Sequence, residues 1–378
     1  MDLTLELLSP CFLGGAHQDP EFRIASLRGV WRYWYRALYG HGNETAPADT
    51  EIRIFGSTKR RGSARIVPRH PVGSLETTTW SKRGGRDQRG ADYLLFSMHT
   101  RAKGEDRQRA YLTPGQTVNL RLILGEEDTE AERALRSLGA ACSFSGLGAR
   151  ARRLAGAVSL RTDAGGVVRK APWIADVPAK DTEELAQRVR GLLGPALARA
   201  CQRPQYHVVA QGWFSAGVVT RTFPGWEMAL DDVGSAYRLF RQFDPPGSQR
   251  RRRPDYDVVK SVVARQPPPP GQTVTRAAFG LPIEFRFNSL SGSPKERVTL
   301  PSREGEKPGE TRRGSPLFLT LDKLANGRLA LIWCLFRSPL APDGRIRVGP
   351  TDYPAPDLSR SIIDEMLGQP FWASHRIA

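Results

Sequence analysis

Residues 144–158 read FSGLGARARRLAGAV, a segment that sets three arginines between glycines directly after an apolar run of helical character. A loop so rich in glycine lets its backbone N–H groups approach a ligand closely, and arginine presents a planar, permanently charged set of donors to phosphate. The alternative is a solvated turn whose arginines pair with acids of the same fold. We expect an anionic polymer to be held here by Gly146, Gly148, Arg150, Arg152 and Arg153.

The length and the charge of the chain narrow the class of protein. A chain of 378 residues favours two domains, because single cores stop growing at about 250–300 residues. Its 39% hydrophobic and 25% charged residues are typical of a soluble globular protein. The 56 Lys and Arg exceed the 39 Asp and Glu by 17, an excess that favours nucleic acid or an anionic surface as partner.

Membrane, metal and disulfide signals are weak. No run of about eighteen apolar residues occurs, and the opening MDLTLELLSP lacks the basic start of a secretory signal, so we expect a cytoplasmic protein with no membrane partner. The cysteines are widely spaced, form no C-x-x-C pair and have no histidine at ligand spacing. We therefore expect no metal, no cofactor and no disulfide, and buried thiols at Cys11, Cys142, Cys201 and Cys334.

The first half alternates strand and helix patterns. Residues 3–9 alternate leucines as a half-buried strand, and residues 26–40 have helical periodicity, with Ser26 as N-cap and Gly40 as stop. Short strands are expected at 51–56, 64–69 and 91–99, a longer strand at 116–125, a helix at 128–144 and a last strand at 155–162. This order predicts a ferredoxin-like βαββαβ unit with insertions over residues 1–165.

The second half, residues 166–378, predicts another α+β unit with an antiparallel sheet. A helix should begin at Asp181, with Glu184 completing a capping box, and Pro195 should break it. A strand is expected within 206–219, a helix at 226–243 and a hairpin that turns at Asn326 and Gly327. Residues 244–255 and 264–274 are rich in proline and charge and are interpreted as flexible insertions.

Five motifs in chain order resemble the RAMP superfamily of CRISPR proteins. They are SPCFLGGAHQ at 9–18, SLRGVWRYWYRALYG at 26–40, IRIFGST at 52–58, GLGARARRLAGA at 146–157 and RRGSPLFL at 312–319. More narrowly, they resemble the first-subunit family of the Cmr complex, the type III-B RNA-guided effector. One departure lies in the glycine-rich loop, where Leu154 stands at the place of the family's third glycine while Gly156 is kept.

The resemblance implies tandem RRM-like ferredoxin folds and a non-catalytic RNA-binding subunit in antiviral defence. Its expected partners are the 3′ region of the guide RNA, the single-stranded target RNA and other Cmr subunits. An alternative is a metal-independent RAMP endoribonuclease that processes precursor guide RNA, for which His17 is the single candidate residue. A third possibility is an assembly protein with little RNA contact of its own.

The helix at 26–40 supplies further candidate ligands. Trp31 and Trp34 fall on its apolar stripe, so we expect them in the core rather than stacked on bases. Like charges four residues apart repel unless an anion or an acidic partner lies over them, and a helix start favours phosphate. We therefore name as candidates Ser26, Arg28, Arg32 and Arg36.

The remaining candidates come from short basic or glycine-containing loops. Adjacent glycines after the first strand could let RNA pass close to the backbone, and the basic turn after residue 56 could contact phosphate or be simply solvated. The RRGSPLFL motif adds two arginines through the resemblance. These candidates are Gly14, Gly15, His17, Ser57, Lys59, Arg60, Arg312 and Arg313.

Overall fold

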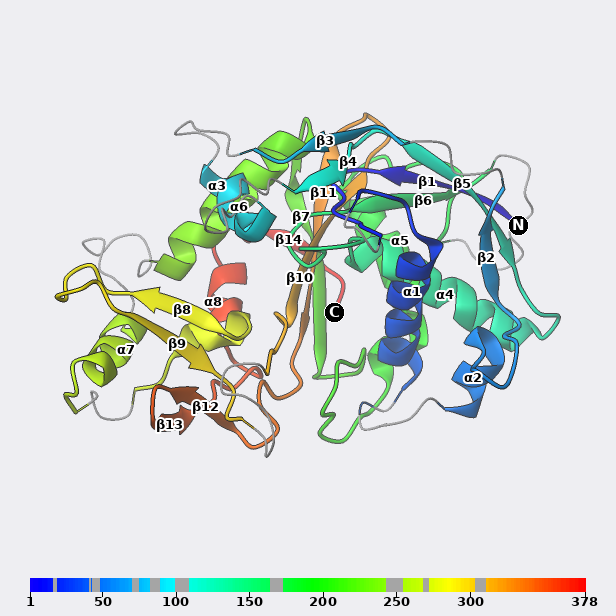
Figure 1. Cartoon of the computed structure of the whole chain (residues 1–378). Coiled ribbons are helices and arrows are strands. Elements are labelled where there is room, and N and C mark those ends of the chain that lie inside the picture. Colours follow the sequence, from blue (N-terminus) through cyan, green and yellow to red (C-terminus); the bar gives the residue numbers. More distant parts are fainter. Residues whose placement is uncertain are drawn as a thin grey trace.

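The computed structural model describes residues 1–15, 19–40, 42, 48–69, 75–81, 89–98, 109–163, 173–242, 254–267, 272–302 and 311–378 (Figure 1). His17 lies outside these residues. So do residues 244–253 and 268–271 of the two segments that are interpreted as flexible insertions.

The first sheet is antiparallel, with strand order β2-β5-β1-β6. Leucines at alternate positions of β1 point into the core, where Leu3 and Leu5 lie opposite Leu120 and Val118 of β5. The unit runs β1 (Asp2–Leu7), α1 (Ile24–Tyr39), β2 (Arg65–Pro68), β5 (Thr117–Ile123), α4 (Asp128–Phe144) and β6 (Val158–Thr162). Its insertions are α2 (Asp49–Phe55), β3 (Thr77–Thr79), α3 (Arg89–Leu94), the 3₁₀ helix η2 (Phe96–Met98) and β4 (Ala110–Leu112).

The second sheet is also antiparallel and has the order β10-β11-β7-β14, and a third sheet has the order β13-β12-β9-β8. Ahead of them lie α5 (Thr182–Leu193) and η3 (Gly194–Ala198). The elements that follow are β7 (Phe214–Phe223), α6 (Trp226–Gln242), α7 (Asp255–Val263), η4 (Thr275–Phe279), β8 (Ile283–Arg286), β9 (Lys295–Thr299), β10 (Leu317–Lys323), β11 (Leu329–Phe336), β12 (Arg345–Val348), β13 (Thr351–Pro354), α8 (Ile362–Leu367), η5 (Pro370–Trp372) and β14 (Ser374–Arg376).

The second sheet stands at the centre of the molecule and is buried on both faces (Figure 1). All eight residues of β11 are buried. Phe336 on one face meets Trp34 of α1, with ring centroids 5.6 Å apart, so this face shares a core with the first unit. Trp333 on the other face belongs to a second core with α6 and α8. The mixed α and β composition with antiparallel sheets is as predicted, while the boundary at residue 165 stays a prediction.

Two strand predictions are wrong. Residues 49–55 form the helix α2, because Glu51, Ile54 and Phe55 are buried at helical spacing although the Ile-Arg-Ile sequence looks alternating. Residues 91–98 are helical because the buried positions, Ala91, Leu94, Leu95 and Met98, follow a helical period along α3 and η2. Both apolar runs are short enough to fit the two-residue period of a strand as well as the period of a helix.

The helix ends agree in part with the sequence. Helix α1 ends before Gly40 as predicted but begins at Ile24, so Ser26 lies in its first turn and is not the N-cap. The Asp181 side chain caps α5 by accepting from the Glu184 N–H at 2.8 Å, and α5 ends at Leu193 just before Pro195. The predicted core positions of Trp31 and Trp34 are confirmed, since both are fully buried.

The glycine-rich loop, residues 146–157, is folded against both halves of the chain. Its Leu154 N–H donates to Leu319 O of β10 at 3.1 Å, and the Leu319 N–H donates back to Arg152 O at 3.2 Å. A Cβ at Gly146 would lie 2.0 Å from Ala155 O, so this position requires glycine. Gly148 has φ of +88° and its Cβ would meet Phe12 O at 2.5 Å, so it also has no room for a side chain.

Leu154, which departs from the family's glycine pattern, adopts the left-handed backbone with φ of +67° and has a fully buried side chain. Its carbonyl accepts from the Ser9 hydroxyl at 2.5 Å. The leucine therefore takes the conformation that a glycine would take and adds apolar packing to the second core.

Replacing Leu154 by glycine should destabilise the fold by roughly 1–3 kcal/mol. Removing a buried leucine side chain costs about 2–5 kcal/mol, and relief of the left-handed backbone returns about 1–2 kcal/mol. Denaturant unfolding measures the difference. Arg150→Gly is the matched control, because Arg150 also has positive φ, +61°, without a fully buried side chain. A Leu154→Gly variant that is stabilised as much as Arg150→Gly would show that the Leu154 side chain contributes no packing energy.

Candidate nucleic-acid interface

The loop arginines are held in place largely by aromatic rings and backbone carbonyls. Arg152 Nη1 donates to Ser315 O at 2.6 Å, and its guanidinium lies 4.4 Å from the centre of the Phe318 ring. The guanidinium of Arg153 lies 5.0 Å from the centre of the Tyr237 ring. Burial, together with the neighbouring Arg153, lowers the pKa of Arg150 to about 10. These contacts orient cations without neutralising them.

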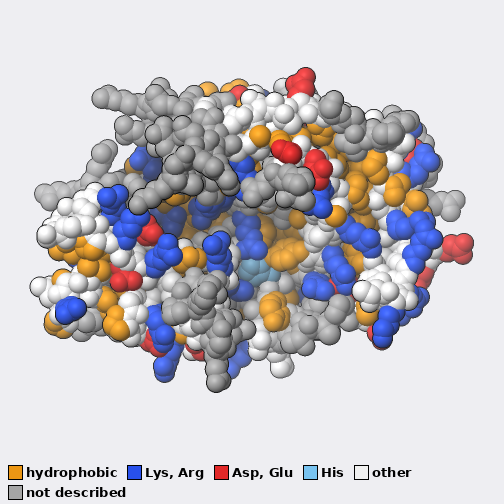
Figure 2. All heavy atoms as spheres, in the orientation of Figure 1, with side chains coloured by type: hydrophobic (Ala, Val, Ile, Leu, Met, Phe, Trp, Pro, Cys, Tyr) orange, Lys and Arg blue, Asp and Glu red, His pale blue; other side chains and the backbone are white. Residues whose placement is uncertain are grey.

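Two cavities, of about 590 and 810 Å³, share Arg152 and Arg313 and so form one groove. Figure 2 shows Lys and Arg side chains around a hollow in this face, between the α1 side and the β8–β9 side. The first cavity is lined by Tyr33, Tyr35, Arg36, Tyr39, Gly40, Gly42, Ala48, Thr50, Glu51, Arg152, Tyr206, His207, Arg312, Arg313 and Gly314. The second is lined by Tyr93, Phe96, Gly148, Arg150, Ala151, Arg152, Arg153, Arg241, Phe279, Gly280, Leu281, Pro282, Ile283, Glu284, Arg313 and Ser315.

The groove carries an excess of positive charge. Within the described residues, neither Arg152 nor Arg313 forms an ion pair with a carboxylate, and Arg313 Nη2 donates to Pro339 O at 3.1 Å. Burial, then the nearby Arg152, lowers the pKa of Arg313. The acid that lines the second cavity is Glu284, which already pairs with two cations of β9. A phosphate would relieve the repulsion between these guanidiniums.

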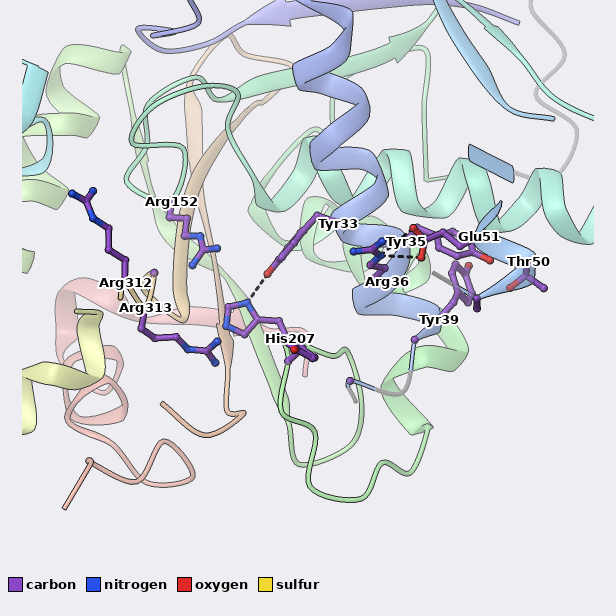
Figure 3. Close-up of a pocket in the computed structure, with 15 residues that line it drawn as sticks. Tyr33, Tyr35, Arg36, Tyr39, Thr50, Glu51, Arg152, His207, Arg312 and Arg313 are labelled. Carbon is purple, nitrogen blue, oxygen red and sulfur yellow. Dashed lines mark hydrogen bonds and ion pairs between the residues drawn. The ribbon is translucent and has the colours of Figure 1, made fainter. Parts of the chain in front are cut away.

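The first cavity is aromatic as well as cationic (Figure 3). Burial raises the pKa of Tyr33, so its hydroxyl keeps its proton, and this hydroxyl shares a hydrogen bond of 2.5 Å with His207 Nδ1. The His207 ring stacks on Phe336 with centroids 4.4 Å apart. Burial, followed by the charges of Arg313 and Arg152, lowers the pKa of His207 well below its ordinary value. The imidazole is therefore neutral at physiological pH.

The arginine ridge of α1 finds its counter-charge inside the chain. Arg32 and Arg36 both bind Glu51 of α2, whose side chain is only 3% exposed; the Arg36 contact is 2.9 Å. Arg28 donates to Phe55 O at the end of the same helix. A buried carboxylate therefore already lies over Arg32 and Arg36, so their repulsion does not require an external anion, and RNA contact by the ridge stays a prediction. Arg36 additionally lines the first cavity.

The other candidates, except Arg312, lie apart from the groove or outside the described residues. Gly14 bridges to Pro20, and a Cβ at Gly15 would meet the flexible Glu21 side chain. Ser57, Lys59 and Arg60 are exposed in a tight turn in which the Ser57 N–H donates to Arg60 O, and they line neither cavity. Ser26 also lines neither cavity, Arg312 lines the first, and His17 is not described.

Several groove residues were not predicted from the sequence. Tyr33 and Tyr39 lie in the quoted helix motif, but that motif was read for its buried stripe and its arginines. His207 and Arg241 come from segments without a motif and reach the groove only through the packing of β11 and α6. Tyrosine beside arginine on one helix was the signal that could have indicated a mixed aromatic and cationic cavity.

The described residues contain neither a metal-binding cluster nor a membrane-spanning helix. No group of three or more His, Cys, Asp and Glu side chains that could hold a metal ion occurs in the part of the chain that the structure describes. Among the helices that it describes, none is long and apolar enough to cross a bilayer. Cys11, Cys142 and Cys334 are buried free thiols, and Cys201 is only partly buried.

Glu51→Gln should lower the free energy of unfolding by about 1–3 kcal/mol, because it leaves Arg32 and Arg36 without their shared carboxylate. Urea unfolding checks this value. Glu132→Gln is the control, because Glu132 pairs with Arg136 but is 44% exposed, and its loss should cost less than about 1 kcal/mol. Equal losses in the two variants would contradict the role given to Glu51.

His207 should make the fold sensitive to acid. The unfolded imidazole binds a proton near pH 6.5, whereas the folded ring does so only at lower pH, so stability present above pH 6.5 is lost as the pH falls below it. The loss should approach about 1.4 kcal/mol per pH unit. Unfolding measured between pH 5 and 7 should show a shallower dependence for His207→Gln, and identical slopes would disprove the assignment.

The chain matches a protein-family model over its first half and a solved structure over nearly its whole length. Residues 4–159 match the RAMP superfamily model. The chain is 29% identical over 176 residues to CRISPR system Cmr subunit Cmr1-2 of Pyrococcus furiosus, covering 42% of this chain and 92% of that protein. It is 28% identical over 148 residues to subunit Cmr1-1 of the same organism, covering 37% of this chain and 41%, less than half, of that protein.

Solved structures extend the likeness of fold. A chain of a type III-B Cmr-beta complex bound to cognate target RNA and AMPPnP, in the presence of single-stranded DNA, matches with a TM-score of 0.51 at 12% identity, covering 97% of this chain and 98% of that one. The apo crystal structure of Cmr1 from Pyrococcus furiosus matches with a TM-score of 0.49 at 19% identity, covering 89% and 87%. The chain therefore resembles the RAMP superfamily and, within it, subunit one of the Cmr complex, as its motifs predicted.

Proposed function

We propose that this protein is a non-catalytic RNA-binding subunit of a type III-B CRISPR effector of the Cmr kind, acting in antiviral defence. Its partners are the 3′ region of the guide RNA, the single-stranded target RNA and other Cmr subunits. The observation that carries the proposal is the groove in which Arg152 and Arg313 join two cavities. Arg152 belongs to the loop that lies inside the segment matching the RAMP model.

Both units are proposed to be ferredoxin-like. In the first, the strands taken in chain order as one to four are arranged two-three-one-four across the sheet, as β2-β5-β1-β6. In the second, β7, β10, β11 and β14 are arranged in the same way, as β10-β11-β7-β14. Helices follow the first strand and precede the fourth in both units. This common order supports a tandem arrangement with α7, β8, β9, β12 and β13 as insertions.

The proposed mode of binding is a groove rather than an open sheet. RRM-type recognition stacks bases on aromatic residues of an exposed sheet face. Here the second sheet is covered on both faces, and the outer face of β1 and β5 carries Thr4, Asn119, Arg121 and Asp2 without aromatic rings. The aromatic and cationic side chains gather instead where the loop meets β10, which favours single-stranded RNA along the groove.

The same geometry supports a binding role over a nuclease role. The histidine in the groove, His207, is neutral, bonded to Tyr33 and stacked face to face on Phe336. A general base needs a free nitrogen within reach of the 2′-hydroxyl of the RNA. His207 Nδ1 is already bonded to the tyrosine hydroxyl and His207 Nε2 is buried, so the imidazole serves to shape the cavity.

Replacing Arg150, Arg152 and Arg153 together with alanine should weaken binding of single-stranded RNA of any sequence. It should also flatten the slope of log K against log salt by about 2, at roughly 0.7 per phosphate contact. Fluorescence anisotropy between 50 and 200 mM salt measures both effects. A melting curve at each salt concentration checks that the variant is folded.

The control for this variant removes the same charge elsewhere. Lys180, Arg345 and Arg360 are exposed and line neither cavity, so their triple alanine variant should keep nearly the wild-type slope. If both triple variants change binding equally, net charge and not the loop is responsible. An unchanged slope in the loop variant removes the loop from the RNA site.

A further inference from the structure

We propose that the second cavity holds one nucleotide of the bound RNA, with its phosphate on the guanidinium of Arg241 and its base stacked on Phe96. This inference rests on the proposed RNA-binding function and deepens it. Neither residue belongs to the glycine-rich loop or to any motif of the sequence. The two come from different segments, α6 and η2, that tertiary packing brings to one cavity.

Arg241 is held by rings and not by an acid. Its guanidinium carbon lies 5.8, 5.4 and 5.2 Å from the ring centres of Tyr93, Tyr237 and Phe279, and its Nη1 donates to the Tyr93 hydroxyl at 2.7 Å. Its Nε is buried without a hydrogen-bond partner within the described residues. The Arg241 side chain also lines the second cavity, where a phosphate oxygen would accept from its guanidinium.

Asp255, whose charge helps to raise the pKa of Arg241, forms its hydrogen bonds and its ion pair with other groups. Asp255 accepts from the backbone N–H groups of Thr275 and Arg276, at 3.1 and 2.7 Å, and pairs with the Arg276 guanidinium at 3.1 Å. Arg276 in turn donates to the Arg241 carbonyl at 3.3 Å, which fixes the backbone of Arg241. The Arg241 guanidinium is therefore positioned but not neutralised, as a phosphate-binding group requires.

The rest of the cavity is suited to an anion. It has five arginines in its lining, and its acid, Glu284, is bound at 2.9 Å by Lys295 and at 3.4 Å by Arg297. Gly280, with φ of +108°, forms part of the wall, and a Cβ there would meet the Arg313 carbonyl at 2.9 Å. Glycine therefore allows the backbone at Gly280 to pack against the backbone at Arg313, which also lines the cavity.

Phe96 supplies the stacking surface. It is 60% exposed although it is a large aromatic residue, and it lines the cavity three residues after Tyr93, the ring that holds Arg241. Every base has a π-face, so an exposed ring beside a phosphate site binds single strands with little sequence preference. An acidic peptide would use the arginines but would gain less from an exposed ring.

The first test is Phe96→Ala, a surface change that leaves the core intact. Binding of oligouridine and oligoadenosine RNA should weaken by between about 5-fold and about 150-fold, which corresponds to ~1–3 kcal/mol. Phe96→Trp should restore binding, and Met228→Ala, another exposed apolar side chain that lines neither cavity, should leave it unchanged. RNA carrying 4-thiouridine should crosslink to a peptide that contains Phe96.

The second test is Arg241→Lys, which keeps the charge but loses the planar donor set and its stacking. It should weaken RNA binding at least 5-fold in a variant whose melting curve shows a folded protein. Wild-type binding in both Phe96→Ala and Arg241→Lys, with binding still lost in the loop triple variant, would overturn this inference and leave the proposed function standing. No RNA binding by the wild type would overturn both.

Competition identifies the occupant of the cavity. Polyglutamate should displace the RNA only at much higher concentration, and its binding should not depend on Phe96. Displacement at equal concentration with the same loss in Phe96→Ala would assign the cavity to an acidic protein partner instead.

Discussion

The arrangement of the whole site depends on the backbone pairing between the glycine-rich loop and β10. Leu154 donates to Leu319 O, and the Leu319 N–H donates to Arg152 O, so a loop of the first unit is joined to β10, an edge strand of the second sheet. Gly146 and Gly148 let the loop pack closely on its own residue Ala155 and on Phe12, because no side chain fits at either position. As a result, the loop arginines project at the junction of the two units, where both cavities meet.

A second constraint follows from the burial of the central sheet. Because β11 is covered on both faces, the central sheet has no free surface there, and the open space that a ligand could enter is the groove between elements. In that groove, arginines are oriented by rings such as Phe318 and Tyr237 and by carbonyls such as Ser315 O. Rings and carbonyls fix geometry without cancelling charge, whereas Arg32 and Arg36 of α1 are bound to the carboxylate of Glu51.

The period of the apolar residues predicts some elements of this chain correctly and others wrongly. The helices α1, α4 and α5 were predicted because each is long enough to show one clear period, and β1 because its leucines alternate strictly with polar residues. Residues 49–55 and 91–98 were not, since a run of seven or eight residues fits both periods until its neighbours decide which side chains are buried. Likewise, the sequence indicates repulsion between the arginines of α1. The carboxylate that pairs with two of them belongs to Glu51, on an element that was predicted as a strand.

The sequence by itself determined the α+β class, the resemblance to the RAMP superfamily and the loop that carries Arg150, Arg152 and Arg153, because local periodicity and contiguous motifs are properties of neighbouring residues. Only the tertiary structure decided that Arg313 joins that loop, that Arg28, Arg32 and Arg36 are bound internally, and that Phe96 and Arg241 share a cavity. These residues are far apart in the chain, and which of them meet depends on how the two sheets pack around one buried strand, β11.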